Sequence, residues 1–143
     1  MSASDVGDGI RPATIEDMPR LMEYARRFHE QSCQPFPFDE DATARMGEIM
    51  IEAPQSTIII GEAGMIGGAL CPAYCAPDWV QAVELFWWAE KGGIALLKAF
   101  EDWAQEVGAS EVRMTTLAAL ERADRLLRGL SYEPAEISYR KVL

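Results

Sequence analysis

The stretch that decides the fold reads VELFWWAEKGGIALL and covers residues 83–97. Its first half is apolar and aromatic, which is typical of a strand, and the pair Gly92-Gly93 leads straight into a helical pattern. A helix that opens directly after such a turn has first N–H groups without intrahelical partners, and these groups point at one place. That arrangement suits an anion such as phosphate. Ordinary caps and loops give the same local pattern, so the rest of the chain decides its meaning.

The bulk composition indicates one globular domain. The chain has 143 residues, of which 49% are hydrophobic and 25% are charged, an ordinary balance for a folded protein. We expect a flexible polar tail over residues 1–9, without the apolar core of a secretory signal, and one domain over residues 10–143. The apolar runs are much shorter than the roughly 20 residues that cross a bilayer, so a membrane is not an expected partner.

The charge and the cysteines narrow the classes of partner. The formal net charge is −10, whereas a nucleic-acid interface needs basic side chains against the phosphates. Nucleic acid is therefore not an expected partner, while cationic small molecules and basic peptides suit an acidic surface. The three cysteines lack metal-ligand spacing, and the single histidine, His29, adds no ligand cluster. We predict no metal site and a reduced, cytoplasmic protein.

Hydrophobic periodicity predicts a mixed α/β chain in the order β-α-α-β-β-β-α-β-α-β. The first helix follows Thr14-Ile-Glu-Asp17, which has the spacing of a capping box. The other predicted helices begin at Asp39, at Gly93 and near Ala118. The predicted strands cover residues 10–13, 57–62, 65–70, 82–88, 111–116 and 135–143.

Four segments in this order resemble the Gcn5-related N-acetyltransferase (GNAT) superfamily. Residues 10–17 are similar to its opening strand and first helix, and residues 65–68 to its third strand. Residues 93–104 are similar to its cofactor-loop helix, and residues 121–132 to its closing helix and turn. The resemblance runs from Ile10 to residue 143. It implies a GNAT-like α/β fold with a mixed, mostly antiparallel central sheet flanked by helices, whose fourth and fifth strands splay apart.

The resemblance also implies a function. Such enzymes transfer the acetyl group of acetyl-CoA to a primary amine, on a small molecule or a peptide, by direct attack in a ternary complex; a homodimer is compatible with this class. The pantetheine arm lies along the fourth strand, and the pyrophosphate binds the loop before the next helix. Carried over to this chain, the acetyl-CoA-binding residues are Leu85, Phe86, Trp87, Lys91, Gly92, Gly93, Ile94, Ala95 and Arg122.

Two side chains are candidates for catalysis. Attack of an amine on a thioester requires a proton acceptor, and Glu84 resembles the strand-four glutamate that acts as base in some family members. The alternative is that Glu84 is only a hydrogen-bonded carboxylate of the sheet. Tyr132 is the candidate proton donor to the leaving thiolate, and its alternative role is packing over the turn after the closing helix.

Three features depart from the family pattern. The phosphate loop is shortened, and Lys91 stands in it as a replacement charge. On the closing helix, Leu120 and Leu127 occupy the positions of the family's frequent Asn and of its Tyr general acid. These departures keep a second hypothesis open, namely a CoA-binding or dimerisation module that retained the sheet and lost the chemistry.

Overall fold

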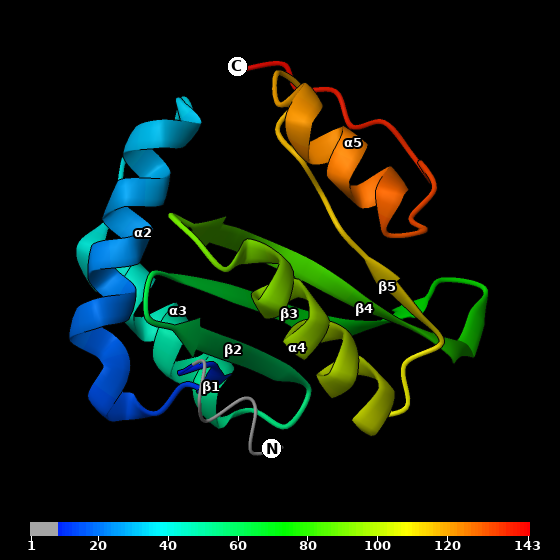
Figure 1. The fold of residues 1–143 in the computed structure, drawn as a ribbon, viewed down its shortest axis with the longest axis horizontal. Helices are drawn as coiled ribbons and strands as arrows, with labels where there is room; N and C mark the ends of the chain where they lie inside the picture. Colours follow the sequence, from blue (N-terminus) through cyan, green and yellow to red (C-terminus); the bar gives the residue numbers. More distant parts are fainter. Residues whose placement is uncertain (1–8) are drawn as a thin grey trace.

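The computed structural model describes residues 9–143, so most of the predicted tail lies outside it. One sheet is flanked by helices (Figure 1). In chain order the elements are β1 (Arg11–Pro12), the 3-10 helix η1 (Ile15–Asp17), α2 (Met18–Ser32), α3 (Glu40–Glu52), β2 (Ser56–Gly61), β3 (Gly64–Ala73), β4 (Ala76–Ala89), α4 (Gly93–Glu106), β5 (Glu111–Arg113) and α5 (Glu121–Gly129).

The five strands form one sheet in the order β1-β2-β3-β4-β5. The pairs from β1 to β4 are antiparallel, and β4 pairs with β5 in parallel. Side chains alternate along β2, so Ile58 and Ile60 pack toward α2 and α3, while Ile59 packs toward α4. Each face of the sheet thus has its own apolar core, and the predicted fold class is confirmed.

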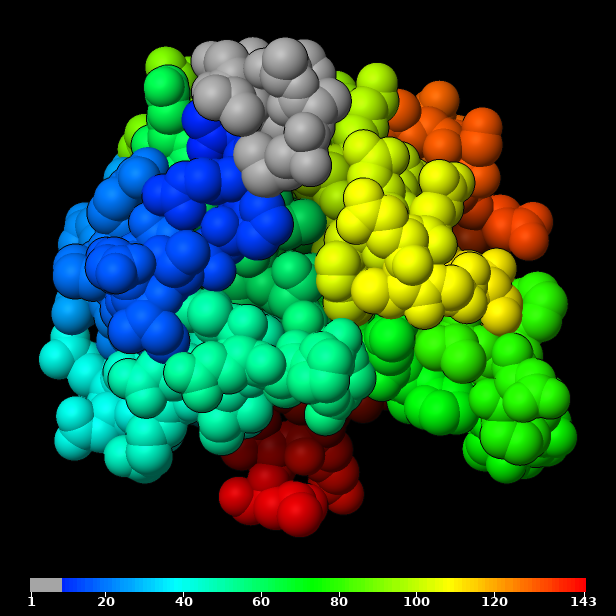
Figure 2. All heavy atoms as spheres, turned by 90° about the horizontal axis from the view of Figure 1, so that it is seen from below, coloured from blue at the N-terminus to red at the C-terminus, as the bar shows by residue number. Residues whose placement is uncertain are grey.

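The predicted final strand over residues 135–143 is wrong. Residues 132–143 form neither helix nor strand, and the side chains of Ile137 and Tyr139 are 76% and 88% exposed. Figure 2 shows this C-terminal segment projecting from the body of the molecule. Although its polar and apolar residues alternate, β5 is paired over only three residues, and this short edge offers little backbone for a further strand.

The start of α2 is built around the buried carboxylate of Asp17. It accepts hydrogen bonds from the Arg11 guanidinium at 2.7 and 2.8 Å and from the Thr14 backbone N–H at 2.8 Å. The bond from Thr14 is half of the predicted capping box. Hydrogen bonding to Arg11 lowers the pKa of Asp17 well below its usual range.

We expect Asp17→Asn to lower the free energy of unfolding by about 2 kcal/mol at neutral pH, because the charge-assisted bonds of the buried Asp17 carboxylate with the partly exposed Arg11 are broken. The folded-state pKa is lowered, so this stabilisation is present above the unfolded-state pKa and is lost as the pH falls through the folded-state value. Urea unfolding at neutral and acidic pH measures both effects. Asp124→Asn, which removes an exposed partner of Arg128, is the control. Equal stability of the two variants at neutral pH would contradict the role given to Asp17.

Candidate active site

The strands β4 and β5 part immediately before Glu84. Their parallel pairing joins Gln81–Val83 to Glu111–Arg113 and ends there. On its other edge, β4 has a bulge at Leu85, since Gly67 opposes Phe86 and Gly68 opposes Glu84. A bulge bends and twists the strand that carries it, which explains why β4 turns away from β5 at this point. The splay implied by the resemblance is therefore present.

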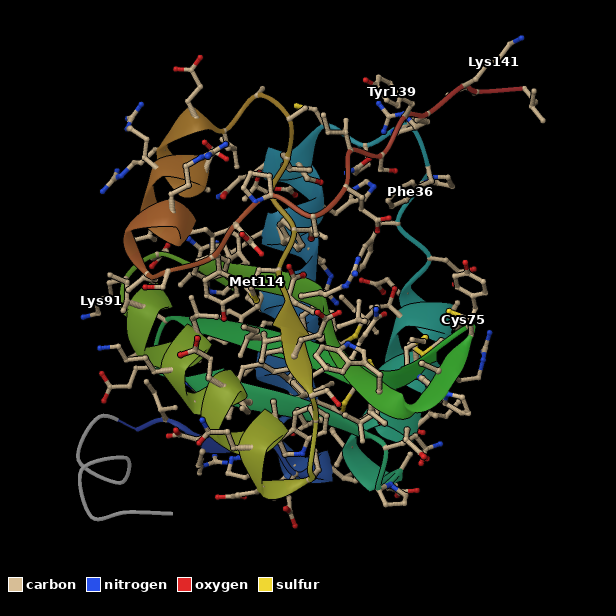
Figure 3. All side chains as sticks on the ribbon, turned by 90° about the vertical axis from the view of Figure 1, so that its right-hand side faces the viewer. Phe36, Cys75, Lys91, Met114, Tyr139 and Lys141 are labelled. Atoms are coloured by element: carbon tan, nitrogen blue, oxygen red, sulfur yellow. The ribbon has the colours of Figure 1, made fainter. Side chains whose placement is uncertain are left out.

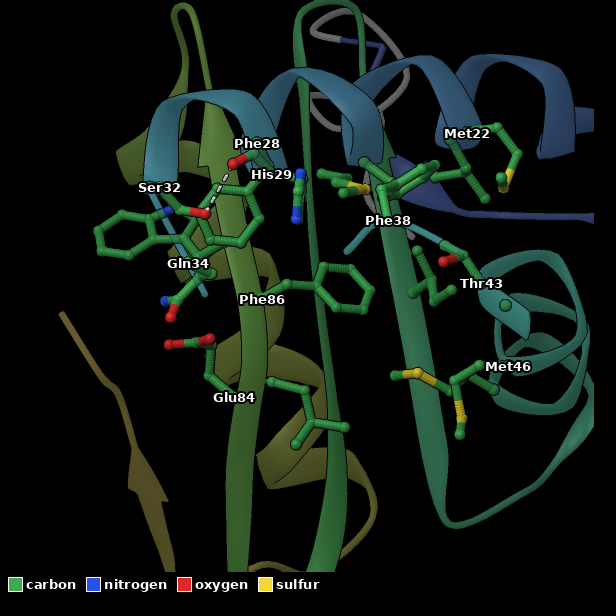
Figure 4. Close-up of a pocket in the computed structure, with 18 of the residues that line it drawn as sticks. Met22, Phe28, His29, Ser32, Gln34, Phe38, Thr43, Met46, Glu84 and Phe86 are labelled. Atoms are coloured by element: carbon green, nitrogen blue, oxygen red, sulfur yellow. Dashed lines mark hydrogen bonds between the residues drawn. The ribbon is translucent and has the colours of Figure 1, made fainter. Parts of the chain in front are cut away.

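Glu84 fills the gap where the strands part. The residue is 4% exposed, and its Oε1 accepts hydrogen bonds of 2.9 Å from both the backbone N–H and the hydroxyl of Thr115. Burial raises the pKa of Glu84, and the two bonds from Thr115 oppose this rise. Figure 4 shows its carboxylate directed away from the ring of Phe86. The site thus holds a carboxyl group that binds its proton more tightly than usual.

An apolar cavity of about 630 Å³ extends from Glu84 to α2 and α3 (Figure 4). Among the described residues, the ionisable side chains that line it are His29, Asp39 and Glu84, with no lysine or arginine. Most of the remaining wall is thioether, aromatic and aliphatic carbon. Its largest apolar members are Met18, Leu21, Met22, Phe28, Phe36, Phe38, Met46, Met50, Ile58, Met65, Leu85, Phe86, Trp87, Leu117 and Leu120.

His29 anchors the segment that joins α2 to α3 along the cavity. Its Nε2 lies 2.7 Å from the backbone oxygen of Phe36, and its ring centroid lies 5.8 and 5.6 Å from those of Phe36 and Phe38. Sequence reasoning gave Phe36 and Phe38 of this segment no role in the site. The signal that could have found it is the alternation of proline and phenylalanine over residues 35–38, which places two rings on a short, stiff connection.

The start of α4 provides free backbone donors. Gly92, the N-cap residue, has φ +78°, a left-handed conformation that favours glycine, and no side chain caps this helix end. The N–H groups of Gly93, Ile94 and Ala95 precede the first full turn of the helix and so lack intrahelical acceptors. The indole Nε1 of Trp87 donates to the backbone oxygen of Gly93 at 3.0 Å and ties the helix start to β4. These donors suit an anion.

Of the other residues predicted to bind acetyl-CoA, three line the cavity and the two basic ones are exposed. Leu85, Phe86 and Trp87 line the cavity together with Glu84. Lys91 is exposed in the three-residue connection before α4 and reaches outward (Figure 3), and Arg122 is exposed on α5.

Tyr132 lies outside the cavity lining. Its hydroxyl donates to Oε2 of Glu101 on α4 at 2.7 Å, and burial together with this bond raises the pKa of Tyr132. The structure therefore does not bring Tyr132 together with Glu84.

Two other features are absent from residues 9–143, namely a metal-ligand cluster and a membrane-spanning helix. No three His, Cys, Asp or Glu side chains gather there in a way that could hold a metal ion. No helix in that range is both long and apolar enough to cross a bilayer. The three cysteines, Cys33, Cys71 and Cys75, are exposed free thiols.

Comparison with known proteins gives matches only at the level of structure. No family model and no curated protein matches the sequence. An aminoglycoside acetyltransferase from an uncultured soil metagenomic sample, in complex with trehalose, superposes with a TM-score of 0.72 at 15% identity, covering 94% of this chain and 95% of that chain. A transcriptional regulator from Bacillus halodurans C-125 gives a TM-score of 0.76 at 16% identity, covering 94% and 98%.

A third similar structure contains coenzyme A. It is an aminoglycoside N-acetyltransferase in complex with CoA, with a TM-score of 0.65 at 19% identity, covering 92% of this chain and 93% of that chain. At identities this low, the superposition shows a shared fold and nothing more specific. Since nearly the whole chain superposes on each of these structures, the chain shares the fold of these acetyltransferases, which is the fold that the resemblance to the GNAT superfamily implied.

Proposed function

We propose that the protein is an acetyl-CoA-dependent N-acetyltransferase that acetylates a primary amine by direct attack in a ternary complex. The observation that carries this proposal is the position of Glu84, a buried carboxyl group at the point where β4 and β5 part and at one end of an apolar cavity. The acetyltransferases among the similar structures, one of them in complex with CoA, support the choice of acetyl donor.

The residues around the parted strands fit the donor. Acetyl-CoA supplies a reactive thioester, a long polar arm and an anionic pyrophosphate. From Glu84 onward β4 has no β5 partner, so backbone groups of Leu85, Phe86 and Trp87 are available to the arm. The free N–H groups of Gly93, Ile94 and Ala95, which follow the N-cap residue Gly92, suit the pyrophosphate, and Lys91 adds a positive charge beside them. Arg122 on α5 adds a further positive charge for the phosphates.

On the acceptor side, Glu84 takes a proton from the attacking amine. A primary amine is mostly protonated at neutral pH and cannot attack in that form, so a proton acceptor is required. The raised pKa of Glu84 makes its carboxylate a stronger base than an ordinary glutamate. The amine nitrogen then attacks the thioester carbonyl directly, so that the C–N bond forms and the C–S bond breaks. The CoA thiolate leaves and takes up the second proton that the nitrogen loses, and no covalent enzyme intermediate forms.

A second candidate function is a CoA-binding module without turnover. The observation that favours it is the placement of the tyrosines, because no tyrosine among the described residues lines the cavity and the hydroxyl of Tyr132 is bound to Glu101. Leu127, at the position of the usual general acid, is buried. Tyr132 can donate a proton to the thiolate only if it leaves Glu101, so the catalytic proposal gives Tyr132 a role that requires movement.

Calorimetric titration with CoA tests the donor site. We expect Lys91→Gln to weaken CoA binding by about threefold to tenfold at low salt, and by less at high salt, because exposed charges are screened. Lys98→Gln, which removes an exposed lysine further along α4, is the matched control and should have little effect. Absence of heat with CoA and with acetyl-CoA would rule out the proposed donor. Equal losses of CoA affinity in the two variants would show that the pyrophosphate does not bind next to Lys91.

A further inference from the structure

We propose that the acceptor is a primary amine with an apolar alkyl or aryl body, and that the cavity discriminates against polyhydroxylated amines. This inference rests on the proposed function and names the substrate class of the same site. It differs from what the names of the similar structures suggest, since aminoglycosides carry many hydroxyl groups.

The wall of the cavity is the first ground for this proposal. Helices α2 and α3 contribute Met18, Met22, Met46 and Met50, and the segment between them contributes Phe36 and Phe38. Methionine side chains are unbranched and polarisable and adapt to irregular apolar shapes. A volume of about 630 Å³ is enough for a small ligand body together with the reacting groups. Burial of alkyl or aryl carbon against this wall is favourable.

The hydroxyl groups in the wall are the second ground, because three of the four already donate hydrogen bonds within the protein. The fourth belongs to Thr116, and the wall also contains the amide group of Gln34. The Ser32 hydroxyl donates to the backbone oxygen of His29 at 3.1 Å, and the Thr43 hydroxyl donates to that of Asp39 at 2.6 Å. The Thr115 hydroxyl donates to Glu84. The hydroxyl groups of a sugar-like acceptor would leave water and find few partners here, and burial of an unpartnered hydroxyl is unfavourable.

The charges are the third ground. The wall contains the carboxyl groups of Glu84 and Asp39. None of the described residues that line it is a lysine or an arginine. Such a cavity attracts a cation and disfavours an anion. Together the three grounds describe an amphipathic ligand, with an ammonium head that reaches Glu84 and an apolar body against the methionines and phenylalanines (Figure 4).

The test compares ligands with the same carbon chain. Hexylamine and 1-amino-1-deoxysorbitol are both linear six-carbon primary amines, and only the second carries hydroxyl groups. Calorimetry in saturating CoA measures binding, and thiol release from acetyl-CoA measures turnover. We expect hexylamine to bind at least about tenfold more tightly than the aminosorbitol and to have the higher kcat/KM by a similar factor. Hexanol, which lacks the positive charge, should bind more weakly than hexylamine.

A variant pair on α3 locates the apolar body. Met46 lines the cavity, whereas Ile49 does not, and the two residues are 55% and 59% exposed. We expect Met46→Gln, which keeps the side-chain length, to weaken hexylamine binding roughly fivefold and to leave the aminosorbitol unchanged or slightly favoured. Ile49→Gln should leave both affinities unchanged. Equal loss of hexylamine binding in the two variants would place the apolar body outside this cavity and overturn the proposal.

The two readouts separate this inference from the function on which it rests. Preferential binding of hexylamine without acetylation of any amine would support the ligand class and overturn the catalytic proposal. Acetylation with preference for the aminosorbitol would support the catalytic proposal and overturn the ligand class. If neither amine binds while CoA does, the ligand class is overturned as well.

Discussion

Replacement of Glu84 by glutamine is expected to lower kcat/KM at neutral pH by about a hundredfold or more, because general-base catalysis contributes on that scale. Glutamine has nearly the same shape, and its carbonyl oxygen can still accept the bonds from Thr115, so the parted strands should keep their geometry. CoA binding should therefore survive in the variant. Steady-state thiol release and CoA calorimetry on the same preparation separate lost chemistry from lost binding.

The pH dependence of the activity should follow from the ionisation of the same carboxyl group. Only ionised Glu84 accepts a proton, so the activity should fall as the pH drops through a pKa that lies above its ordinary value of 4.5. This acidic limb should be missing from the small residual activity of Glu84→Gln. A pH profile of kcat/KM for the wild type and the variant measures the difference.

The free energy of unfolding should change with pH in the opposite direction from the activity. The folded-state pKa of Glu84 is raised, so the folded protein binds this proton more tightly, and the free energy of unfolding decreases as the pH rises from the unfolded-state to the folded-state pKa. Above both values the ionised group destabilises the fold. Glu84→Gln should thus be at least as stable as the wild type at neutral pH, as is typical of a residue kept for function.

Glu111→Gln is the matched control for Glu84. Glu111 is a carboxylate on β5 that accepts a 2.8 Å bond from Arg113 and does not line the cavity. Its replacement should change kcat/KM by no more than about twofold. An unchanged kcat/KM in Glu84→Gln, or equal losses of kcat/KM in the two variants, would show that Glu84 is not the general base.

Replacement of Gly68 by alanine is expected to lower the free energy of unfolding by about 3 kcal/mol, through overpacking between β4 and α4. Gly68 opposes Glu84 across the β3–β4 ladder. A Cβ atom there would lie 2.5 Å from Cζ of Phe100, which is fully buried, and closer still to the backbone oxygen of Val83. Neither neighbour has room to move, so the sheet or α4 must shift next to the bulge.

Urea unfolding of Gly68→Ala measures this effect, with Gly129→Ala as the control. A Cβ on Gly129 would meet nothing within 4 Å, so its stability should change by at most about 0.5 kcal/mol. Stability of Gly68→Ala equal to that of the wild type would show that α4 does not press on the sheet at this point.

Features that depend on neighbouring residues could be predicted from the sequence. The β-branched run Ile58–Ile60 forms a central strand, and the Thr14–Asp17 spacing forms the start of the first helix, because each signal is local. The glycine pair at Gly92-Gly93 likewise opens a helix, with Gly92 in a left-handed conformation. The position of Glu84 beside the strand gap followed from the family resemblance and from the order of the strands.

Features that depend on pairing between distant segments could not be predicted. The bulge at Leu85 is a property of the register between β3 and β4, and the bonds from Thr115 to Glu84 join residues that are 31 positions apart. From the sequence, Pro72 and Pro77 were expected to end the hairpin formed by residues 57–62 and 65–70. Instead β3 includes Pro72, which pairs with Val80, and β4 includes Pro77, both close to the turn that joins these two strands. The prediction of a final strand over residues 135–143 was wrong because an alternating sequence does not by itself supply a partner strand.

Amine-dependent release of CoA from acetyl-CoA is the most direct test of the proposed function. Free thiol and acetylated product are measured together, with hexylamine as acceptor and with Glu84→Gln as the inactive comparison. We expect thiol release that requires both substrates, equals the acetylated amine formed, and falls by at least about a hundredfold in the variant. Tight CoA binding with no amine-dependent thiol release across primary amines would contradict this account and identify the chain as a CoA-binding module.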